Sequence, residues 1–206
     1  MDEPRIERLH TVTSTQEIAR GLPIGSVVVT DHQSAGRGRL DRRWEAPPGT
    51  ALLASFVLPR HPLLSLAAGV AAAEACGEGV GLKWPNDLMV GDRKAGGILV
   101  EVAADKAIVG IGINLTAAPP GAATIAQPRD QLLERLRERL ARWSVADSAA
   151  VLDRWRELSV TLGRTVRVEL PGRVIEGVAA GIDEGGALIV GGEHVSAGDV
   201  IHLRMG

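Results

Sequence analysis

The segment KWPNDLMVGDRKAGGI, residues 83–98, carries short apolar runs separated by turn residues. Gly91 and Asp92 have the composition of a hairpin turn between two of these runs. Apolar and β-branched residues also precede Pro85 and follow Ala95. The pattern therefore predicts three strands in quick succession, at residues 80–84, 88–90 and 95–102.

The polar residues of this segment are candidates for a functional site. A proline after a strand forces an extended exit and a turn, which would aim Asn86 and Asp87 off the end of the sheet. These residues could also serve only to form the turn, without a functional role. Only three of the 23 basic residues are lysines, and two of them lie here, which favours a functional reading of Lys94. The pair Gly96-Gly97 would leave one strand face open, so that Lys94 points into a site.

The pattern outside this segment predicts an α+β protein. Further strands are predicted at residues 5–10, 26–30, 51–58 and 107–115, and helices at 62–76, 129–143 and 148–162. Another helix opens at Ser14 as N-cap, with Glu17 three residues later, as in a capping box. Residues 32–43 and 116–128 have no apolar period and predict long loops.

The sequence pattern changes after Gly163, where short apolar runs are separated by glycines. Strands are predicted at residues 165–170, 174–182, 187–190 and 200–204. Such a series suggests a small β-barrel. We place the domain boundary near Gly163, which gives domains at residues 1–162 and 163–206.

The segment QSAGRGRLDRRW, residues 33–44, alternates glycines with arginines and is called the Gly-Arg loop below. Gly36 and Gly38 let the backbone approach a ligand closely and leave N–H groups free for an anion. The arginines would neutralise phosphate or carboxylate oxygens. The same composition is typical of a solvated basic loop or of an RNA-binding segment. The loop by itself leaves these alternatives open.

The segment GIGIN, residues 110–114, ends an apolar run with an amide side chain. Glycines inside a strand indicate that a ligand or another backbone approaches closely. Asn114 would either contact that ligand or start the following loop. The sequence contains neither a G-x-G-x-x-G fingerprint opening a helix nor a P-loop motif.

Composition limits the remaining function classes. A chain of 206 residues with 45% apolar content buries a sizeable core in one medium domain or a domain with a small appendage. A net charge of -2 argues against a surface built to bind nucleic acid or anionic membranes. The first residues have no apolar signal region, and the apolar stretch 63–76 is too short to span a bilayer, so we expect a cytoplasmic protein.

The single cysteine and the scattered histidines indicate neither a disulfide nor a zinc site. Cys76 lies within the apolar helix and is expected to be an inert core thiol. The five histidines contain no pair at ligand spacing, so we expect no protein-built metal site.

Five spaced motifs, taken in order, resemble those of the biotin protein ligase family. They are Ser14-Thr15, the Gly-Arg loop, residues 83–87, Lys94 with Gly97-Ile98, and residues 112–114. The resemblance implies a catalytic domain with a mixed sheet flanked by helices, related to class II aminoacyl-tRNA synthetases and lipoate ligases. It also implies a small SH3-like barrel as C-terminal domain. About a dozen residues precede Ser14, so we expect a stand-alone ligase without a DNA-binding domain and no binding of DNA.

The resemblance implies a role for each matching residue. Biotin contacts would come from Ser14, Thr15, Gln16, Gln33, Arg37, Gly38, Arg39, Lys94 and Gly97. The ATP and adenylate end would be served by Arg39, Arg42, Trp44, Asn86, Lys94 and Asn114. Gln16 departs from the family's usual asparagine, and its extra methylene would shift a hydrogen bond to the biotin ureido group.

The implied reaction joins biotin and ATP into biotinyl-5'-AMP and then transfers biotin to a lysine of a biotin carboxyl carrier protein domain of acyl-CoA carboxylases. Arg39 and Lys94 would neutralise the anions that meet in the first step. Mg²⁺ would be held chiefly by the phosphates. Asp87 is the candidate to orient or deprotonate the acceptor lysine, which makes Arg39, Lys94 and Asp87 the expected catalytic residues.

Three other functions remain as alternatives. A lipoate or octanoate ligase shares the scaffold, but the Gly-Arg loop and the C-terminal barrel favour biotin. A biotin-sensing repressor would need a DNA-binding domain. An RNA-binding protein is disfavoured by the net charge and by an aromatic content of only 2%. We also expect the Gly-Arg loop to be mobile without ligand and to become ordered over the adenylate.

Overall fold

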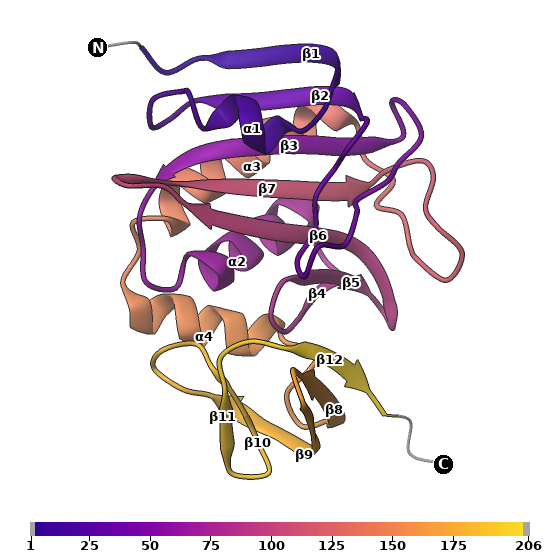
Figure 1. The fold of residues 1–206 in the computed structure, drawn as a ribbon, viewed down its shortest axis with the longest axis vertical. Helices are drawn as coiled ribbons and strands as arrows, with labels where there is room; N and C mark the ends of the chain where they lie inside the picture. The colour runs from indigo at the N-terminus through magenta and orange to yellow at the C-terminus, as the bar shows by residue number, and fades with distance from the viewer. Residues whose placement is uncertain (1–2, 204–206) are drawn as a thin grey trace.

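The computed structural model describes residues 3–203, whose strands form two sheets (Figure 1). The first sheet has seven strands in the order β1-β2-β3-β7-β6-β5-β4. Its strands are β1 (Ile6–Val12), β2 (Val27–Gln33), β3 (Ala51–Pro59), β4 (Val80–Lys83), β5 (Asp87–Val90), β6 (Arg93–Val102) and β7 (Lys106–Asn114). β1 pairs with β2 in parallel and the other neighbours pair antiparallel, which confirms the predicted mixed sheet.

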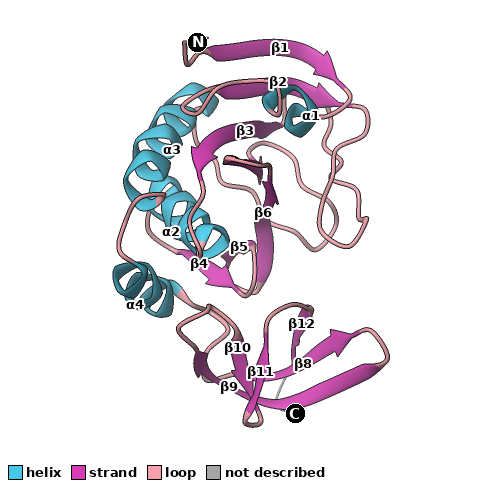
Figure 2. Ribbon diagram, turned by 60° about the vertical axis from the view of Figure 1, so that its left-hand side comes forward, coloured by secondary structure: helices cyan, strands magenta, loops and turns pink. Residues whose placement is uncertain are grey.

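Helices cover both faces of this sheet (Figure 2). The short helix α1 (Thr15–Ala19) contacts β2, β3 and β7 on one face. The helices α2 (Leu64–Cys76) and α3 (Arg129–Trp143) pack on the other face, and α4 (Ser148–Leu158) packs against α2. Alternation along the strands explains this arrangement, since Val27 and Val29 point into the large core while Val28 points towards α1.

Helix α2 is buried on nearly all sides because its side chains are small. Most of its residues are buried alanines and other small or apolar residues. Cys76 is buried as predicted, and burial raises the pKa of its thiol to about 12, which supports the expectation of an unreactive thiol at neutral pH. Within residues 3–203, no helix has both the length and the apolar character needed to cross a membrane.

The second sheet forms the C-terminal β-sheet domain and has five antiparallel strands in the order β11-β10-β9-β8-β12. The strands are β8 (Thr165–Leu170), β9 (Arg173–Ile182), β10 (Leu188–Val190), β11 (Glu193–Val195) and β12 (Asp199–His202). The three-residue strand β11 was not predicted, because so short a run carries almost no alternation. The predicted last strand extends to Arg204, which lies outside the described residues.

Two local predictions were wrong for tertiary reasons. Ser14 is the N-cap of α1, but its side chain makes no capping hydrogen bond; instead Gln33 accepts a hydrogen bond from the Thr15 backbone N–H at 2.8 Å. The predicted helix 148–162 ends at Leu158, because the Val160 N–H donates to the Leu82 carbonyl oxygen of β4. Helix α1 still forms without the capping box, whereas α4 ends early because pairing with β4 competes with further helix formation.

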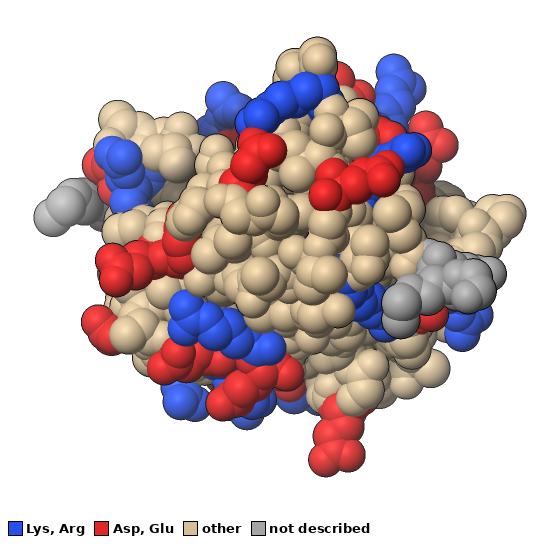
Figure 3. All heavy atoms as spheres, turned by 90° about the horizontal axis from the view of Figure 1, so that it is seen from below, with Lys and Arg blue, Asp and Glu red and all other residues tan. Residues whose placement is uncertain are grey.

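The two sheets meet at Trp84, directly after β4. Its backbone N–H donates to Thr161 Oγ1 and its indole Nε1–H donates to the Gly186 carbonyl oxygen, both at 3.0 Å. Arg164 and Asp92 form a second link between the sheets, an ion pair at 2.7 Å. Figure 3 views the molecule from the end formed by β8–β12, where acidic and basic side chains are interspersed.

Candidate active site

A pocket that is open to solvent on one side lies on the α1 face of the seven-stranded sheet. Strands β3, β6 and β7 form its floor, α1 closes one end, and the Gly-Arg loop covers it. The turn between β4 and β5 and the start of β12 complete its wall. Segments far apart in the sequence therefore meet in one cavity.

Glycines on β6 and β7 give the floor its shape. Gly97 lies opposite Gly112 in the β6–β7 pairing, and Gly110 lies on the same face of β7. A Cβ atom on Gly110 would lie 3.1 Å from the Gln16 side chain, and one on Gly112 would lie 2.8 Å from Trp44 Nε1. A close approach at the GIGIN segment was predicted for a ligand or another backbone; in the structure the groups that approach Gly110 and Gly112 are the side chains of Gln16 and Trp44.

Polar side chains at the α1 end of the pocket are only partly paired. Thr15 Oγ1 contacts Gln33 Oε1 at 3.1 Å and Ser55 Oγ at 2.7 Å. Gln16 Nε2 donates to the Leu99 carbonyl oxygen at 3.2 Å. Ser14 Oγ and Gln16 Oε1 are buried without a protein partner. Buried polar atoms normally have hydrogen-bond partners, so these two atoms mark a place for a polar ligand.

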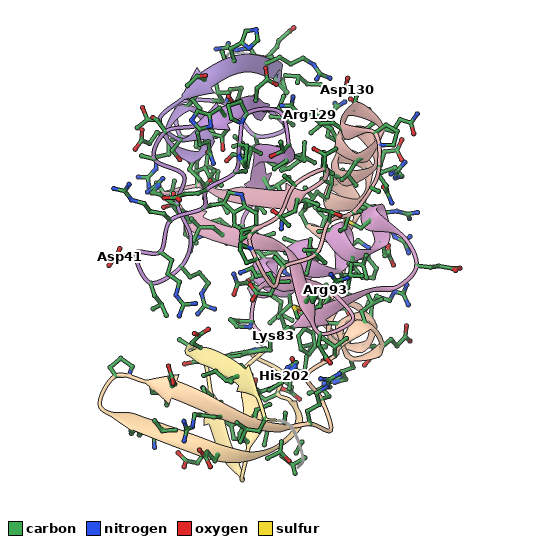
Figure 4. The ribbon with its side chains drawn as sticks, turned by 90° about the vertical axis from the view of Figure 1, so that its right-hand side faces the viewer. Asp41, Lys83, Arg93, Arg129, Asp130 and His202 are labelled. Atoms are coloured by element: carbon green, nitrogen blue, oxygen red, sulfur yellow. The ribbon has the colours of Figure 1, made fainter. Side chains whose placement is uncertain are left out.

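The Gly-Arg loop is a narrow hairpin rather than an extended coil. The Gly38 N–H donates to the Arg42 carbonyl oxygen at 2.7 Å, and the Trp44 N–H donates to the Gly36 carbonyl oxygen at 3.0 Å. Its tip, Leu40 and Asp41, has positive φ angles of 54° and 56°. Figure 4 shows Asp41 at this tip, which projects beside the C-terminal sheet.

The arginines of this hairpin are held by three different elements. Arg37 forms an ion pair with Glu101 of β6 at 2.9 Å. Arg39 donates to Asn86 Oδ1 at 3.0 Å, at the turn before β5. Arg42 forms an ion pair with Asp199 of β12 at 2.5 Å. Burial lowers the pKa of Arg39, so a bound anion would stabilise its charge.

Lys94 and Asp87 form an ion pair inside the pocket. Lys94 Nζ lies 2.6 Å from Asp87 Oδ1 and 5.8 Å from the centre of the Trp44 ring. The two residues sit on the paired strands β5 and β6, where Asp87 lies opposite Gly97 and Lys94 lies opposite Met89, so their side chains meet diagonally. The pocket thus combines a mobile ammonium group, a carboxylate and the guanidinium of Arg39.

The structure brings together all but one of the site residues predicted from the sequence. The pocket is lined by Ser14, Thr15, Gln16, Gln33, Arg37, Gly38, Arg39, Arg42, Trp44, Asn86, Asp87, Lys94 and Gly97. Asn114 does not line it; its Nδ2 donates to the Ala123 carbonyl oxygen at 3.1 Å. Two residues that line the pocket were not among the predicted site residues, Lys83 and Asp199. Lys83 could have been found because it is one of only three lysines among the 23 basic residues. No motif marks Asp199, because it comes from the second sheet.

Asp199 is ionised in this wall. Burial alone would raise the pKa of its carboxyl, but the hydrogen bond and charge of Arg42 hold that pKa below its usual value. In residues 3–203 no group of three or more His, Cys, Asp or Glu side chains is arranged to hold a metal ion. A divalent cation at this site would therefore depend on ligand oxygens.

The chain is similar to proteins and structures that bind or attach biotin. It is 38% identical, over 213 residues, to the biotin–[acetyl-CoA-carboxylase] ligase of Mycobacterium tuberculosis, an alignment that covers 87% of this chain and 80% of that protein. The structure of the Aquifex aeolicus biotin protein ligase in complex with biotin and ATP superposes with a TM-score of 0.86 at 27% identity, over 98% of this chain and 99% of that one. The Leishmania major enzyme in complex with biotinyl-5-AMP superposes with a TM-score of 0.69 at 26% identity, over 99% and 100% of the chains.

Family matches cover both sheets. Residues 4–116 match the Biotin/lipoate A/B protein ligase family, and residues 161–203 match the Biotin protein ligase C terminal domain. The fold and the pocket thus define an enzyme of the biotin and lipoate ligase class. Within that class the second match and the identity to the mycobacterial enzyme decide between the two substrates. The chain belongs to the biotin protein ligase family.

Proposed function

We propose that the pocket joins biotin and ATP into biotinyl-5'-AMP and presents this adenylate to a lysine of a biotin carboxyl carrier protein domain. ATP-dependent ligation of biotin follows from the family to which the chain belongs. The residue roles, the carrier domain and the accompanying Mg²⁺ are the parts that we propose.

The observation that carries the proposal is the combination of unpartnered polar atoms and cations in one pocket. Biotin has a ureido group at one end and a carboxylate at the other. Ser14 Oγ and Gln16 Oε1 would pair with the ureido group, because they are buried without partners on the α1 side. Arg39 and Lys94 line the same pocket and would take the carboxylate.

The first step needs positive charge, because a carboxylate oxygen attacks the α-phosphate and pyrophosphate leaves. Arg39 and Lys94 would stabilise the negative charge on the phosphate oxygens. Trp44 lies against Gly97 and Gly112 and would pack against the nucleotide end. No cluster of carboxylates among the described residues is suited to a metal ion, so Mg²⁺ would be bound mainly by the phosphates.

The second step forms an amide between the acceptor lysine and the biotin carbonyl carbon, and the bond to the AMP oxygen breaks. The acceptor must lose a proton before it attacks. One oxygen of Asp87 pairs with Lys94, and the carboxylate keeps acceptor sites for an incoming ammonium group. Asp87 would orient that group and accept its proton.

The identity of the substrate is tested directly by incubating the chain with ATP, Mg²⁺ and either biotin or lipoate. We expect biotinyl-5'-AMP, detected by mass, and little lipoyl-AMP. Adenylation of lipoate in preference to biotin would overturn the proposed substrate and leave the fold assignment standing.

The role of Asp87 is tested by Asp87→Asn, which keeps the size of the side chain and removes its basicity. We expect transfer from preformed biotinyl-5'-AMP to fall about 100-fold, within the usual range for loss of a general base, and adenylate formation to fall less. Single-turnover measurements of the two steps separate these effects. Asp92→Asn is the matched control, since it changes the same group in the turn that follows β5. Equal slowing of both steps by Asp87→Asn would show that Asp87 only positions Lys94.

Several predictions stay predictions. These are the domain bounds 1–162 and 163–206, a location in the cytoplasm, and the absence of DNA binding. They concern the setting of the enzyme rather than the chemistry of the pocket.

A further inference from the structure

Asp199 is the one charged side chain that the C-terminal sheet contributes to the pocket wall in residues 3–203. It lies at the start of β12, and its side chain is 34% exposed. Its partner Arg42 belongs to the Gly-Arg loop, 157 residues earlier in the sequence. The loop that covers the pocket is thus attached to the second sheet as well as to the first.

Arg42 is well placed to control the shape of the loop. It directly follows the tip residues Leu40 and Asp41, whose positive φ angles are costly for residues other than glycine. Leu40 is 65% exposed and buries little that would offset this cost. The tip therefore depends on contacts at its base, among them the backbone bonds from Gly38 to Arg42 and from Arg42 to Arg39 and the Arg42–Asp199 ion pair.

The charge of Asp199 argues against a direct role in holding ATP. A carboxylate beside a triphosphate repels it, and Arg42 neutralises this carboxylate in the structure. Arg37 and Arg39 are bound by β6 and by the β4–β5 turn, so they do not connect the loop to the second sheet. Asp199 instead holds Arg42, the residue that follows the tip of the loop, in place.

We propose that Asp199 is a positioning residue that holds the Gly-Arg loop closed through Arg42, so that the C-terminal sheet controls how long biotinyl-5'-AMP is retained. The part of this inference that concerns biotinyl-5'-AMP rests on the proposed function. The part that concerns closure of the loop rests on the structure alone. It makes the C-terminal sheet part of the adenylation site as well as a separate domain.

The test of loop closure needs no ligand. Asp199→Asn should increase amide hydrogen exchange of residues 33–44 about two- to fivefold, the range set by a partly exposed ion pair. Arg42→Gln should have a similar effect, and the double variant should exchange no faster than either single variant, since both remove one contact. Additive effects in the double variant would overturn the proposal.

Two controls isolate the Arg42–Asp199 contact. Glu193→Gln removes the Arg173–Glu193 ion pair of the same sheet, and Asp92→Asn removes the Arg164–Asp92 ion pair between the sheets. Neither pair touches the loop, so loop exchange should match that of the unchanged chain. Faster loop exchange in Asp92→Asn would mean that general docking of the sheets, and not Asp199, holds the loop.

Retention is measured as the release rate of preformed biotinyl-5'-AMP. Asp199→Asn should release it about two- to fivefold faster, with both controls unchanged. Faster exchange without faster release would overturn the functional part of the inference. Failure of the unchanged chain to form biotinyl-5'-AMP would instead count against the proposed function and leave the exchange result valid.

Discussion

Gly112 shows how a single residue shapes the pocket. The sequence indicates a close approach at this position, because a glycine inside an apolar strand costs stability without a compensating contact. The structure identifies the approaching group as the Trp44 indole, which lies where a Cβ atom would be. Asn114, two residues further on, bonds to Ala123 instead of lining the pocket. Both residues lie near the end of β7, and the sequence did not show that only one of them would line the pocket.

Gly112→Ala is expected to displace Trp44 while the sheet stays folded. The added methyl group would lie 2.8 Å from Trp44 Nε1, and an indole on a surface loop yields more easily than a strand does. If Trp44 packs against the nucleotide, losing a stacking contact of about 1–3 kcal/mol would raise the KM for ATP about tenfold. Gly181→Ala is the control, because nothing lies within 4 Å of its Cβ position. An unchanged KM for ATP in Gly112→Ala would exclude Trp44 from the nucleotide site.

Strand β12 carries a histidine whose protonation opposes folding. Burial, Lys83 and Arg164 lower the pKa of His202 to about 4 from an ordinary value of 6.5. Figure 4 shows Lys83 and His202 next to each other where the two sheets meet. Between these two pH values the unfolded chain binds more protons at this group than the folded chain does.

The free energy of unfolding should therefore fall as the pH drops from 6.5 towards 4. The contribution of His202 is fully present above pH 6.5 and is lost by about pH 4. His202→Gln should reduce the slope of stability against pH in this window, as measured by urea unfolding at several pH values. Identical slopes in the two proteins would show that His202 is accessible to protons in the folded state.

The Gly-Arg loop was predicted to be mobile without ligand, and this stays a prediction. Its hairpin bonds and its ion pairs to Glu101 and Asp199 describe the closed form. The exchange measurement proposed for Asp199, repeated with biotin and ATP, tests whether ligands protect the loop.

At the scale of the whole molecule, Trp84 couples the two sheets. Its indole N–H donates to the Gly186 carbonyl oxygen before β10, while the ring packs in the hydrophobic core, which includes residues of both sheets. Trp84→Phe should keep most of the packing and lower the free energy of unfolding by about 1 kcal/mol, because the partly buried Gly186 carbonyl loses its donor. Urea unfolding measures this loss.

Trp143→Phe is the matched control for this prediction. It removes an indole hydrogen bond of the same length, 3.0 Å, to Glu74 of α2. Only Trp84→Phe should also speed hydrogen exchange at residues 183–190, because only Trp84 bonds to the second sheet. Equal exchange in the two variants would show that the sheets are not coupled through this bond.

The sequence by itself determined the mixed α+β fold, the five ordered motifs and most of the residues that line the pocket. Strand alternation and the glycines and arginines of the loop are local signals, and the resemblance of the five motifs to a known family supplied the other pocket residues. Only the tertiary structure decided that Gln33 replaces a capping box at α1, that Asn114 bonds away from the pocket, and that Asp199 reaches the Gly-Arg loop. These contacts join residues that are far apart in the chain, and their partners are chosen by packing of the two sheets, which no local pattern encodes.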